Sequence, residues 1–233
     1  MNKNILITGA SSGIGRETAL YLHSKGYRVV LLARSVEKLE LLSHELGDSL
    51  IIEYDLNNLA DIENIFLKLQ GMGLKLDGMV HCAGINRDMP VKANELHDML
   101  ETMNINLLSF IQLSKFFCLK KYSNNGSSVI AMSSIAAISC DKSMCTYSAS
   151  KAGLDAAVRV MSKEFARRKI RVNSIQPTFV DTPMLNGLSE EQKNNQPLGI
   201  INPVNVAYLI EFLLSDKSAY ISGSNIKMSS AIM

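Results

Sequence analysis

The sequence predicts one α/β domain built on a doubly wound, seven-stranded parallel sheet with helices on both faces. Short runs of β-branched and other apolar residues alternate with longer amphipathic segments along the whole chain, a pattern typical of a parallel sheet covered by helices. No Pro/Gly/Ser-rich linker interrupts the 233 residues, and α/β domains commonly reach this size undivided. We therefore treat residues 1–233 as a single domain.

Seven short segments rich in Val, Ile and Leu are predicted to be strands. They are Asn4–Thr8, Arg28–Ala33, Leu50–Tyr54, Gly78–His81, Ser128–Met132, Arg171–Gln176 and Asn225–Met228. In sheets of this kind, ligands bind beyond the carboxyl ends of the strands, where the strand order reverses.

Helices are expected where apolar residues recur three and four positions apart. The first contains Ile14, Thr18, Tyr21 and Leu22 at this spacing, and Gly26 follows as a C-terminal cap. The others are expected at Val36–Glu45, Leu59–Leu69, Glu95–Leu119, Cys145–Ala166 and Val204–Leu214. The polar segment 183–202 follows the sixth strand, so it is either a substrate loop that covers the site or a plain solvated loop.

Composition excludes several classes of protein. The chain has 24 Lys plus Arg against 22 Asp plus Glu, so no basic surplus points to nucleic acid. No apolar run approaches the ~18 residues of a membrane span, and the N-terminus does not resemble a signal peptide. The four cysteines lack zinc-ligand spacing. We expect free thiols, no metal site and a cytoplasmic location.

A glycine-rich turn joins the first strand to the first helix. Gly9, Gly13 and Gly15 let the backbone turn tightly and approach a pyrophosphate closely. The helix N-terminus offers free N–H donors to the phosphates. The candidate cofactor-binding residues here are Gly9, Ser11, Ser12, Gly13, Ile14 and Gly15. A purely structural turn is the alternative, although its place between strand and helix favours a nucleotide.

The end of the second strand indicates which cofactor binds. No Asp or Glu occurs from Thr18 to Val36, and Arg34 stands at the strand end. A carboxylate there would bind the adenosine ribose of NAD, whereas an arginine accommodates a 2′-phosphate, so NADP(H) is favoured over NAD(H). The alternative is that Arg34 is simply a solvated residue at the strand end. Asp55 and Leu56, after the third strand, are further cofactor candidates, with a turn cap as the alternative role of Asp55.

Tyr147 and Lys151 are four residues apart on a predicted helix and share the face turned toward the sheet. An ammonium nearby is expected to lower the pKa of the tyrosine, which suits it to exchange protons with an alcohol or carbonyl. Ser134 lies 13 residues upstream of Tyr147, just beyond the fifth strand, where its hydroxyl can hold a substrate oxygen. Taken singly, each residue also has an ordinary structural explanation.

Together, the glycine motif, Ser134, Tyr147 and Lys151 resemble the short-chain dehydrogenase/reductase superfamily from Ile5 to about Met228. The resemblance implies a Rossmann fold, with Tyr147 as acid/base, Lys151 lowering its pKa and binding the nicotinamide ribose, and Ser134 orienting the carbonyl. Asn106 matches the asparagine that positions a water in the proton relay; a helix-kinking structural amide is the alternative. The remaining cofactor-binding residues implied are Cys82, Ala83, Gly84, Pro177 and Thr182, with Tyr147 and Lys151.

Three segments depart from the pattern of this superfamily. His81-Cys82 replaces the usual Asn-Asn, Thr178 replaces the glycine after Pro177, and the tail from Met228 to Ala231 lacks the usual acidic-glycine-glycine ending. They affect nicotinamide packing and assembly contacts, and they motivate one alternative, a non-catalytic nucleotide-binding regulatory protein.

The motifs are most similar to those of the 3-oxoacyl-(acyl-carrier-protein) reductase branch. They imply an NAD(P)(H)-dependent oxidoreductase that transfers a hydride between nicotinamide and a small-molecule ketone or secondary alcohol. Reduction of a sugar, polyol or other small biosynthetic ketone is the alternative, which the polar 183–202 loop favours. An acyl carrier protein is a possible partner through Lys120-Lys121 and Arg167-Arg168-Lys169, unless these are solvated helix ends. The superfamily commonly forms homodimers or homotetramers.

Overall fold

The fold is a seven-stranded sheet between two layers of helices, as the sequence predicts. The computed structural model describes residues 3–47, 49–185 and 196–231. Every neighbouring pair of strands is parallel, in the order β3-β2-β1-β4-β5-β6-β7. The strands are β1 (Asn4–Thr8), β2 (Arg28–Ala33), β3 (Leu50–Glu53), β4 (Leu76–His81), β5 (Ser123–Met132), β6 (Arg171–Pro177) and β7 (Asn225–Met228). The order reverses between β1 and β4, which is where ligands of such sheets bind.

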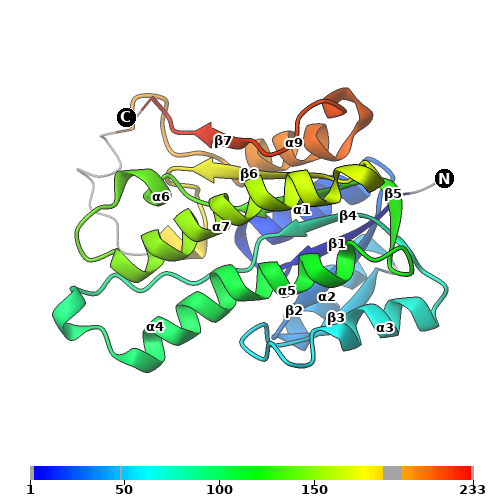
Figure 1. Cartoon of the computed structure of the whole chain (residues 1–233), viewed down its shortest axis with the longest axis horizontal. Coiled ribbons are helices and arrows are strands. Elements are labelled where there is room, and N and C mark those ends of the chain that lie inside the picture. The colour runs from blue at the N-terminus through cyan, green and yellow to red at the C-terminus, as the bar shows by residue number, and fades with distance from the viewer. Residues whose placement is uncertain (1–2, 48, 186–195, 232–233) are drawn as a thin grey trace.

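Helices cover both faces of the sheet (Figure 1). On one face are α3 (Glu63–Gly71), α4 (Leu96–Met103), α5 (Ser109–Phe117) and α7 (Cys145–Glu164); on the other are α1 (Gly13–Ser24), α2 (Val36–Leu46) and α9 (Pro203–Leu214). Among the described residues, no helix is both long enough and apolar enough to cross a membrane.

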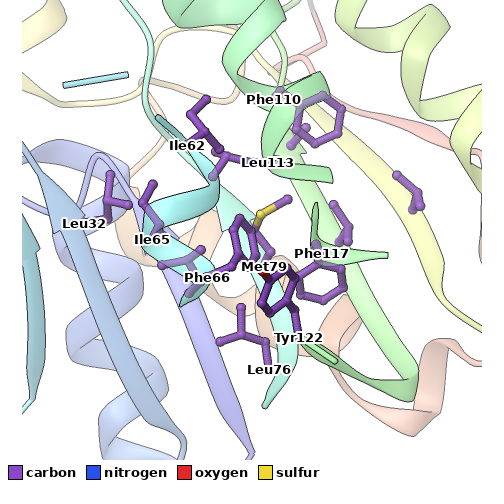
Figure 2. Close-up of a cluster of buried hydrophobic side chains, with 14 of the residues drawn as sticks. Leu32, Ile62, Ile65, Phe66, Leu76, Met79, Phe110, Leu113, Phe117 and Tyr122 are labelled. Carbon is purple, nitrogen blue, oxygen red and sulfur yellow. The ribbon is translucent and has the colours of Figure 1, made fainter. Parts of the chain in front are cut away.

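Apolar side chains form one core on each face because successive strand residues point to opposite sides. In β1, Leu6 packs into one core, and Ile5 and Ile7 pack into the other. Figure 2 shows the first core, where the ring of Phe66 from α3 packs against the ring of Tyr122, which precedes β5. These two cores fix the strand ends, and the strand ends carry the candidate site.

The helix expected over 95–119 is interrupted. A π-helical turn at Asn104–Leu108 separates α4 from α5, and such turns occur frequently at functional sites. A short helix, α6 (Ala136–Ser139), follows β5 and was not expected. The helix expected from Leu59 begins only at Glu63, because turns occupy residues 60–62.

Part of the expected substrate loop, residues 186–195, lies outside the described residues. Of the rest, Pro183–Leu185 forms a 3-10 turn, and Ile201 pairs with Val180 in an isolated parallel bridge. The end of this segment therefore lies beside Val180, just beyond the carboxyl end of β6.

His81 is a fully buried residue at the carboxyl end of β4. Its Nδ1 lies 3.0 Å from Thr8 Oγ1, which also accepts a hydrogen bond from the Ala83 N–H. The Thr8 hydroxyl proton is therefore available to Nδ1. Nε2 is buried without a hydrogen-bond partner among the described residues. Burial, aided by the positive charge of Lys151, lowers the pKa of His81 to about 3, so the imidazole is neutral.

This buried imidazole makes stability dependent on pH. The unfolded state binds a proton below the ordinary histidine pKa of about 6.5, whereas the folded state does so only near 3. Stability is therefore lost as pH falls between these values. We predict that, between pH 7 and pH 4, the free energy of unfolding falls by roughly 3 kcal/mol less in His81→Asn than in the wild type. Urea unfolding at the two pH values measures this difference.

The control is His23→Asn, because His23 is exposed and its ring is solvated before and after unfolding. The unfolding free energy of His23→Asn is expected to depend on pH in the same way as that of the wild type. If His81→Asn does the same, His81 does not cause the acid sensitivity.

Candidate active site

A cavity of about 620 Å³ opens at the carboxyl ends of β1, β2 and β4, a volume typical of ligand pockets. It spans the point where the strand order reverses. The sequence-predicted cofactor residues that line it are Gly9, Ser11, Ser12, Gly13, Ile14, Gly15, Arg34, Asp55, Leu56, Cys82, Ala83, Gly84 and Thr182. Tyr147, Lys151 and Pro177 are not among its lining residues.

The glycines of the first turn are required by close approaches. Gly9 has φ +67°, and a Cβ there would lie 2.8 Å from the Ala83 nitrogen. A Cβ on Gly15 would lie 2.3 Å from the Gly9 carbonyl oxygen. Contacts this short exclude any side chain, so the turn brings β1, β4 and the start of α1 together.

The N-terminus of α1 is open toward the cavity. Gly13, Ile14 and Gly15 form its first turn and line the cavity. The Ser12 side chain, at the N-cap, makes no capping hydrogen bond, and the first turn contains no acidic residue. Free backbone donors at a helix N-terminus favour an anion. The cavity volume, the glycine turn and this open terminus fit a dinucleotide with its pyrophosphate over α1.

The far wall of the cavity is basic. Arg34 follows β2, and the wall also contains Ser35 and Lys38 from the start of α2. The sequence analysis missed Lys38, although its position three residues after Ser35 was a usable signal because residues at this spacing share a helix face. Asp55 also lines the cavity, but its carboxylate accepts a hydrogen bond from the Asn57 N–H at 3.0 Å, which is the turn-capping role.

Helix α7 places Tyr147 and Lys151 side by side beneath the sheet edge, both buried. The Lys151 Nζ lies 5.7 Å from the centre of the tyrosine ring and donates a 2.7 Å hydrogen bond to the Met132 carbonyl at the end of β5. Ser134 follows two residues later, and its Oγ accepts from the Ala136 N–H at 3.1 Å. The Ser134 hydroxyl proton is therefore free for another acceptor.

Asn106 occupies the π-helical turn and is fully buried. Its Oδ1 accepts from the Ile85 N–H at 2.8 Å, and its Nδ2 donates to the Ile85 carbonyl and to Ser150 Oγ. The amide thus fastens the loop after β4 to α7. A Cβ on Gly84 would lie 3.3 Å from Lys151 Nζ and 3.4 Å from Asn106 Oδ1. Because Gly84 also lines the cavity, the cavity adjoins Lys151 and Asn106 at this glycine.

The electrostatics differ from the sequence expectation at Tyr147. Burial raises the pKa of Tyr147, and an interaction with the Ser134 hydroxyl only partly opposes this. Burial also lowers the pKa of Lys151 to about 8, so the lysine is already neutral at the high pH where the buried tyrosine would ionise. Both groups are thus shifted toward their neutral forms. The neutral form of the tyrosine is a phenol, which donates a proton.

The departures at the ends of β6 and β7 contact one another. The Thr178 hydroxyl lies 3.4 Å from the Met228 carbonyl and from Ser230 Oγ, and Ser230 donates to the Gly199 carbonyl at 3.0 Å. Pro177 is buried, and its carbonyl accepts from the Ile135 N–H next to Ser134.

In the described part of the chain, no group of three or more His, Cys, Asp or Glu side chains is arranged to hold a metal ion.

Comparisons with known proteins agree with this arrangement. The family model described as enoyl-(acyl carrier protein) reductase matches residues 9–230. The human 3-oxoacyl-[acyl-carrier-protein] reductase is 36% identical over 226 residues, 96% of this chain and 94% of the relative. The enzyme named 3-oxoacyl-[acyl-carrier-protein] reductase FabG in Rickettsia conorii is 35% identical over 236 residues, 99% of this chain and 97% of the relative.

A solved structure is similar over the whole length. The short-chain dehydrogenase/reductase described as a glucose/ribitol dehydrogenase from Brucella melitensis superposes with a TM-score of 0.93 at 28% identity, covering 100% of this chain and 97% of that one. With the seven-stranded parallel sheet and the matches along the full chain, this confirms the predicted fold and family. The chain belongs to the short-chain dehydrogenase/reductase superfamily and is a nicotinamide-dependent oxidoreductase.

Proposed function

We propose that this protein is an NADP(H)-dependent reductase of a 3-oxoacyl thioester. The observation that carries the proposal is the buried Tyr147 phenol beside Lys151 and near Ser134. Lys151 adjoins Gly84, which lines a cavity with a basic wall. Relatives named 3-oxoacyl-[acyl-carrier-protein] reductase that match 96% or more of the chain supply the substrate class.

The side chains suit carbonyl reduction. Nicotinamide, when bound, supplies the hydride to the carbonyl carbon. Ser134 donates its free hydroxyl proton as a hydrogen bond to the substrate oxygen and holds it in place. Tyr147 then gives its proton to that oxygen as negative charge develops. Because burial raises the pKa of Tyr147, the residue is in the protonated form that reduction requires.

Lys151 and Asn106 complete the proton path. The Lys151 ammonium stabilises the phenolate left on Tyr147, and its pKa of about 8 allows it to pass on a proton near neutral pH. Asn106 holds the Ile85 backbone and Ser150, so in this proposal it keeps the space beside Gly84 and Lys151 in shape for a water molecule that restores the proton.

Tyr147→Phe is expected to lower kcat for reduction of acetoacetyl-CoA with NADPH by about 10²–10⁴-fold, because it removes the proton donor. The measurement is the loss of absorbance at the reduced-nicotinamide band. As a control, Tyr21→Phe alters a tyrosine on α1 that packs against Tyr208, and it should keep wild-type turnover.

The same assay separates the rival activities. Turnover of crotonyl-CoA but not acetoacetyl-CoA would support the enoyl reduction named in the family model's description, and turnover only of sugar or polyol ketones would support the alternative in the sequence analysis. A protein that binds NADPH but reduces none of them, and whose cellular role survives Tyr147→Phe, would be a regulatory protein. Any of these outcomes contradicts the proposed substrate.

The preference for NADP(H) is proposed from Arg34 and Lys38. Both line the cavity beside Ser35, so their charges and the Ser35 hydroxyl form a site for a 2′-phosphate. The strand end holds no carboxylate that would bind an unmodified ribose.

Arg34→Ala is expected to weaken NADPH binding by at least about tenfold and to change NADH binding by less than about twofold, because charge-assisted hydrogen bonds contribute roughly 1.5–3 kcal/mol each. Titration of cofactor fluorescence measures both dissociation constants. The matched control is Arg16→Ala, which removes an arginine of α1 that pairs with Glu45 outside the cavity. Equal losses for both cofactors would show that Arg34 does not bind the 2′-phosphate.

The two basic clusters expected to bind an acyl carrier protein make contacts within this chain. Arg168 donates to the Cys118 and Ser123 carbonyls at 2.6 and 2.7 Å, and Lys121 pairs with Glu63 at 3.3 Å. Arg168 therefore joins the turn after α7 to the end of α5 and the start of β5, and Lys121 joins the loop before β5 to α3. We propose that the thioester is recognised mainly by its acyl group, so that a coenzyme A thioester suffices for turnover.

Assembly and location are also proposed. Leu96 and Leu100 of α4, Leu108 of the π-helical turn and Val160 of α7 are exposed apolar side chains on neighbouring helices, which supports a homodimer or homotetramer. Sedimentation velocity should give the mass of two or four chains, and a monomer at micromolar concentration would refute this.

Four free cysteines support a reducing compartment such as the cytoplasm.

A further inference from the structure

Helix α7 carries four polar side chains in one stripe toward the sheet. Tyr147, Lys151, Asp155 and Arg159 follow one another at intervals of four residues, which places successive Cβ atoms roughly 5–6 Å apart on one helix face. Asp155 is only 4% exposed. A carboxyl group is rarely buried to this extent unless it is paired or hydrogen-bonded, so its surroundings require an explanation.

Three side chains from two strands donate hydrogen bonds to Asp155. Gln176 Nε2 lies 2.6 Å from Oδ2, and Asn225 Nδ2 lies 3.2 Å from Oδ1. Ser174 Oγ lies 2.7 Å from Oδ1, and it accepts a hydrogen bond from Asn225 Nδ2 at 2.6 Å, which leaves its own proton for Asp155. All three groups are donors, so this environment is built for a carboxylate that accepts hydrogen bonds.

These bonds join the middle of α7 to the sheet next to the reacting groups. Ser174 and Gln176 lie on β6, and Asn225 on β7. One turn earlier, Lys151 is attached to β5 through the Met132 carbonyl. Asp155 therefore fixes both the position of α7 and a negative charge one turn from the lysine.

We propose that Asp155 is a positioning residue for the reaction: its buried carboxylate keeps Lys151 in the ammonium form at neutral pH and holds α7 against β6 and β7. The inference deepens the proposed function, because it assigns to Asp155 the charge that the proton path through Lys151 and Tyr147 requires.

The groups around Lys151 leave Asp155 as its source of negative charge. On α7 itself, Tyr147 is a neutral phenol. From β4, His81 is neutral, and burial raises the pKa of the Cys82 thiol to about 12; β5 contributes the Met132 carbonyl. Burial lowers the pKa of Lys151 to about 8, and the charge of Asp155 is the first of the effects that oppose this. Around Asp155, the other charged group on its helix face is Arg159, whose guanidinium donates to Asn225 Oδ1.

The test replaces the charge and keeps the shape. Asp155→Asn has nearly the volume of the aspartate and still accepts from Ser174. Its new amide nitrogen would face Gln176 Nε2, but Gln176 Oε1 is buried without a partner among the described residues. A half-turn of the Gln176 amide therefore supplies an acceptor, and the variant is expected to fold. Asp155→Ser, uncharged and smaller, serves the same purpose if Asp155→Asn does not fold.

The control keeps the charge and removes a hydroxyl group. Ser174→Ala deletes the hydroxyl that donates to Asp155 and accepts from Asn225, without changing any charge. It should lower the midpoint of urea unfolding and leave the ionisation of Lys151 unchanged.

The primary readout is independent of turnover. In protein labelled with ¹³C at the lysine side chains, the signal absent from Lys151→Met is followed against pH by NMR. We expect a midpoint near pH 8 in the wild type, a midpoint lower by about one unit in Asp155→Asn, and the wild-type midpoint in Ser174→Ala. An Asp155→Asn midpoint within about 0.3 unit of the wild type would overturn the proposal.

A second readout depends on the proposed function. If reduction needs charged Lys151, the alkaline limb of kcat for acetoacetyl-CoA moves to lower pH in Asp155→Asn by the same amount as the NMR midpoint, and stays in place in Ser174→Ala. An NMR midpoint that moves while the kcat profile does not would contradict the role of Lys151 in the reaction. A wild type that lacks turnover would refute the proposed function and leave the NMR result on Asp155 standing.

Discussion

The proposed mechanism depends on keeping a primary amine charged inside the protein. Lys151 is almost fully buried, so desolvation favours its neutral form, and its pKa falls to about 8. Lys151 donates to the Met132 carbonyl at the end of β5 and lies beside the Tyr147 ring, and the charge of Asp155, one helical turn further along α7, raises its pKa. Gly84 lies against this amine, because a Cβ there would be only 3.3 Å from Lys151 Nζ and would require the lysine to shift slightly.

The cavity and the catalytic group depend on the same contacts between strand ends. The Gly9 turn lies so close to Ala83 that β1 and β4 cannot separate without opening the cofactor cradle. Thr8 joins this contact through hydrogen bonds to Ala83 and His81. The loop that continues from β4 is held by Asn106, which in turn contacts Ser150 on α7. A chain of short polar contacts thus runs from the phosphate cradle to the tyrosine.

Much of this was predictable because it is local. Short apolar runs placed all seven strands. The glycine turn, Ser134, Tyr147 and Lys151 were predicted from their spacing and order, and Asn106 from the resemblance to the superfamily. The remaining features depend on contacts between residues distant in sequence. The π-helical turn, the bonds from β6 and β7 to Asp155, and the place of Lys38 in the cavity wall are of this kind. The predicted lowering of the Tyr147 pKa was wrong. Four-residue spacing reveals that Lys151 is a neighbour, but it does not reveal how strongly burial raises the pKa of the phenol.

The π-helical turn also links catalysis to the apolar core. An extra residue in a helix rotates everything beyond it by about 100°. The turn at Asn104–Leu108 precedes Phe110, Leu113 and Phe117, which fill the core shown in Figure 2. Removing one residue from the turn would swing these rings away from the sheet while also displacing Asn106. A one-residue deletion here would therefore disturb both the packing of the core and the position of Asn106, so the helix phase at this turn constrains two distant parts of the protein at once.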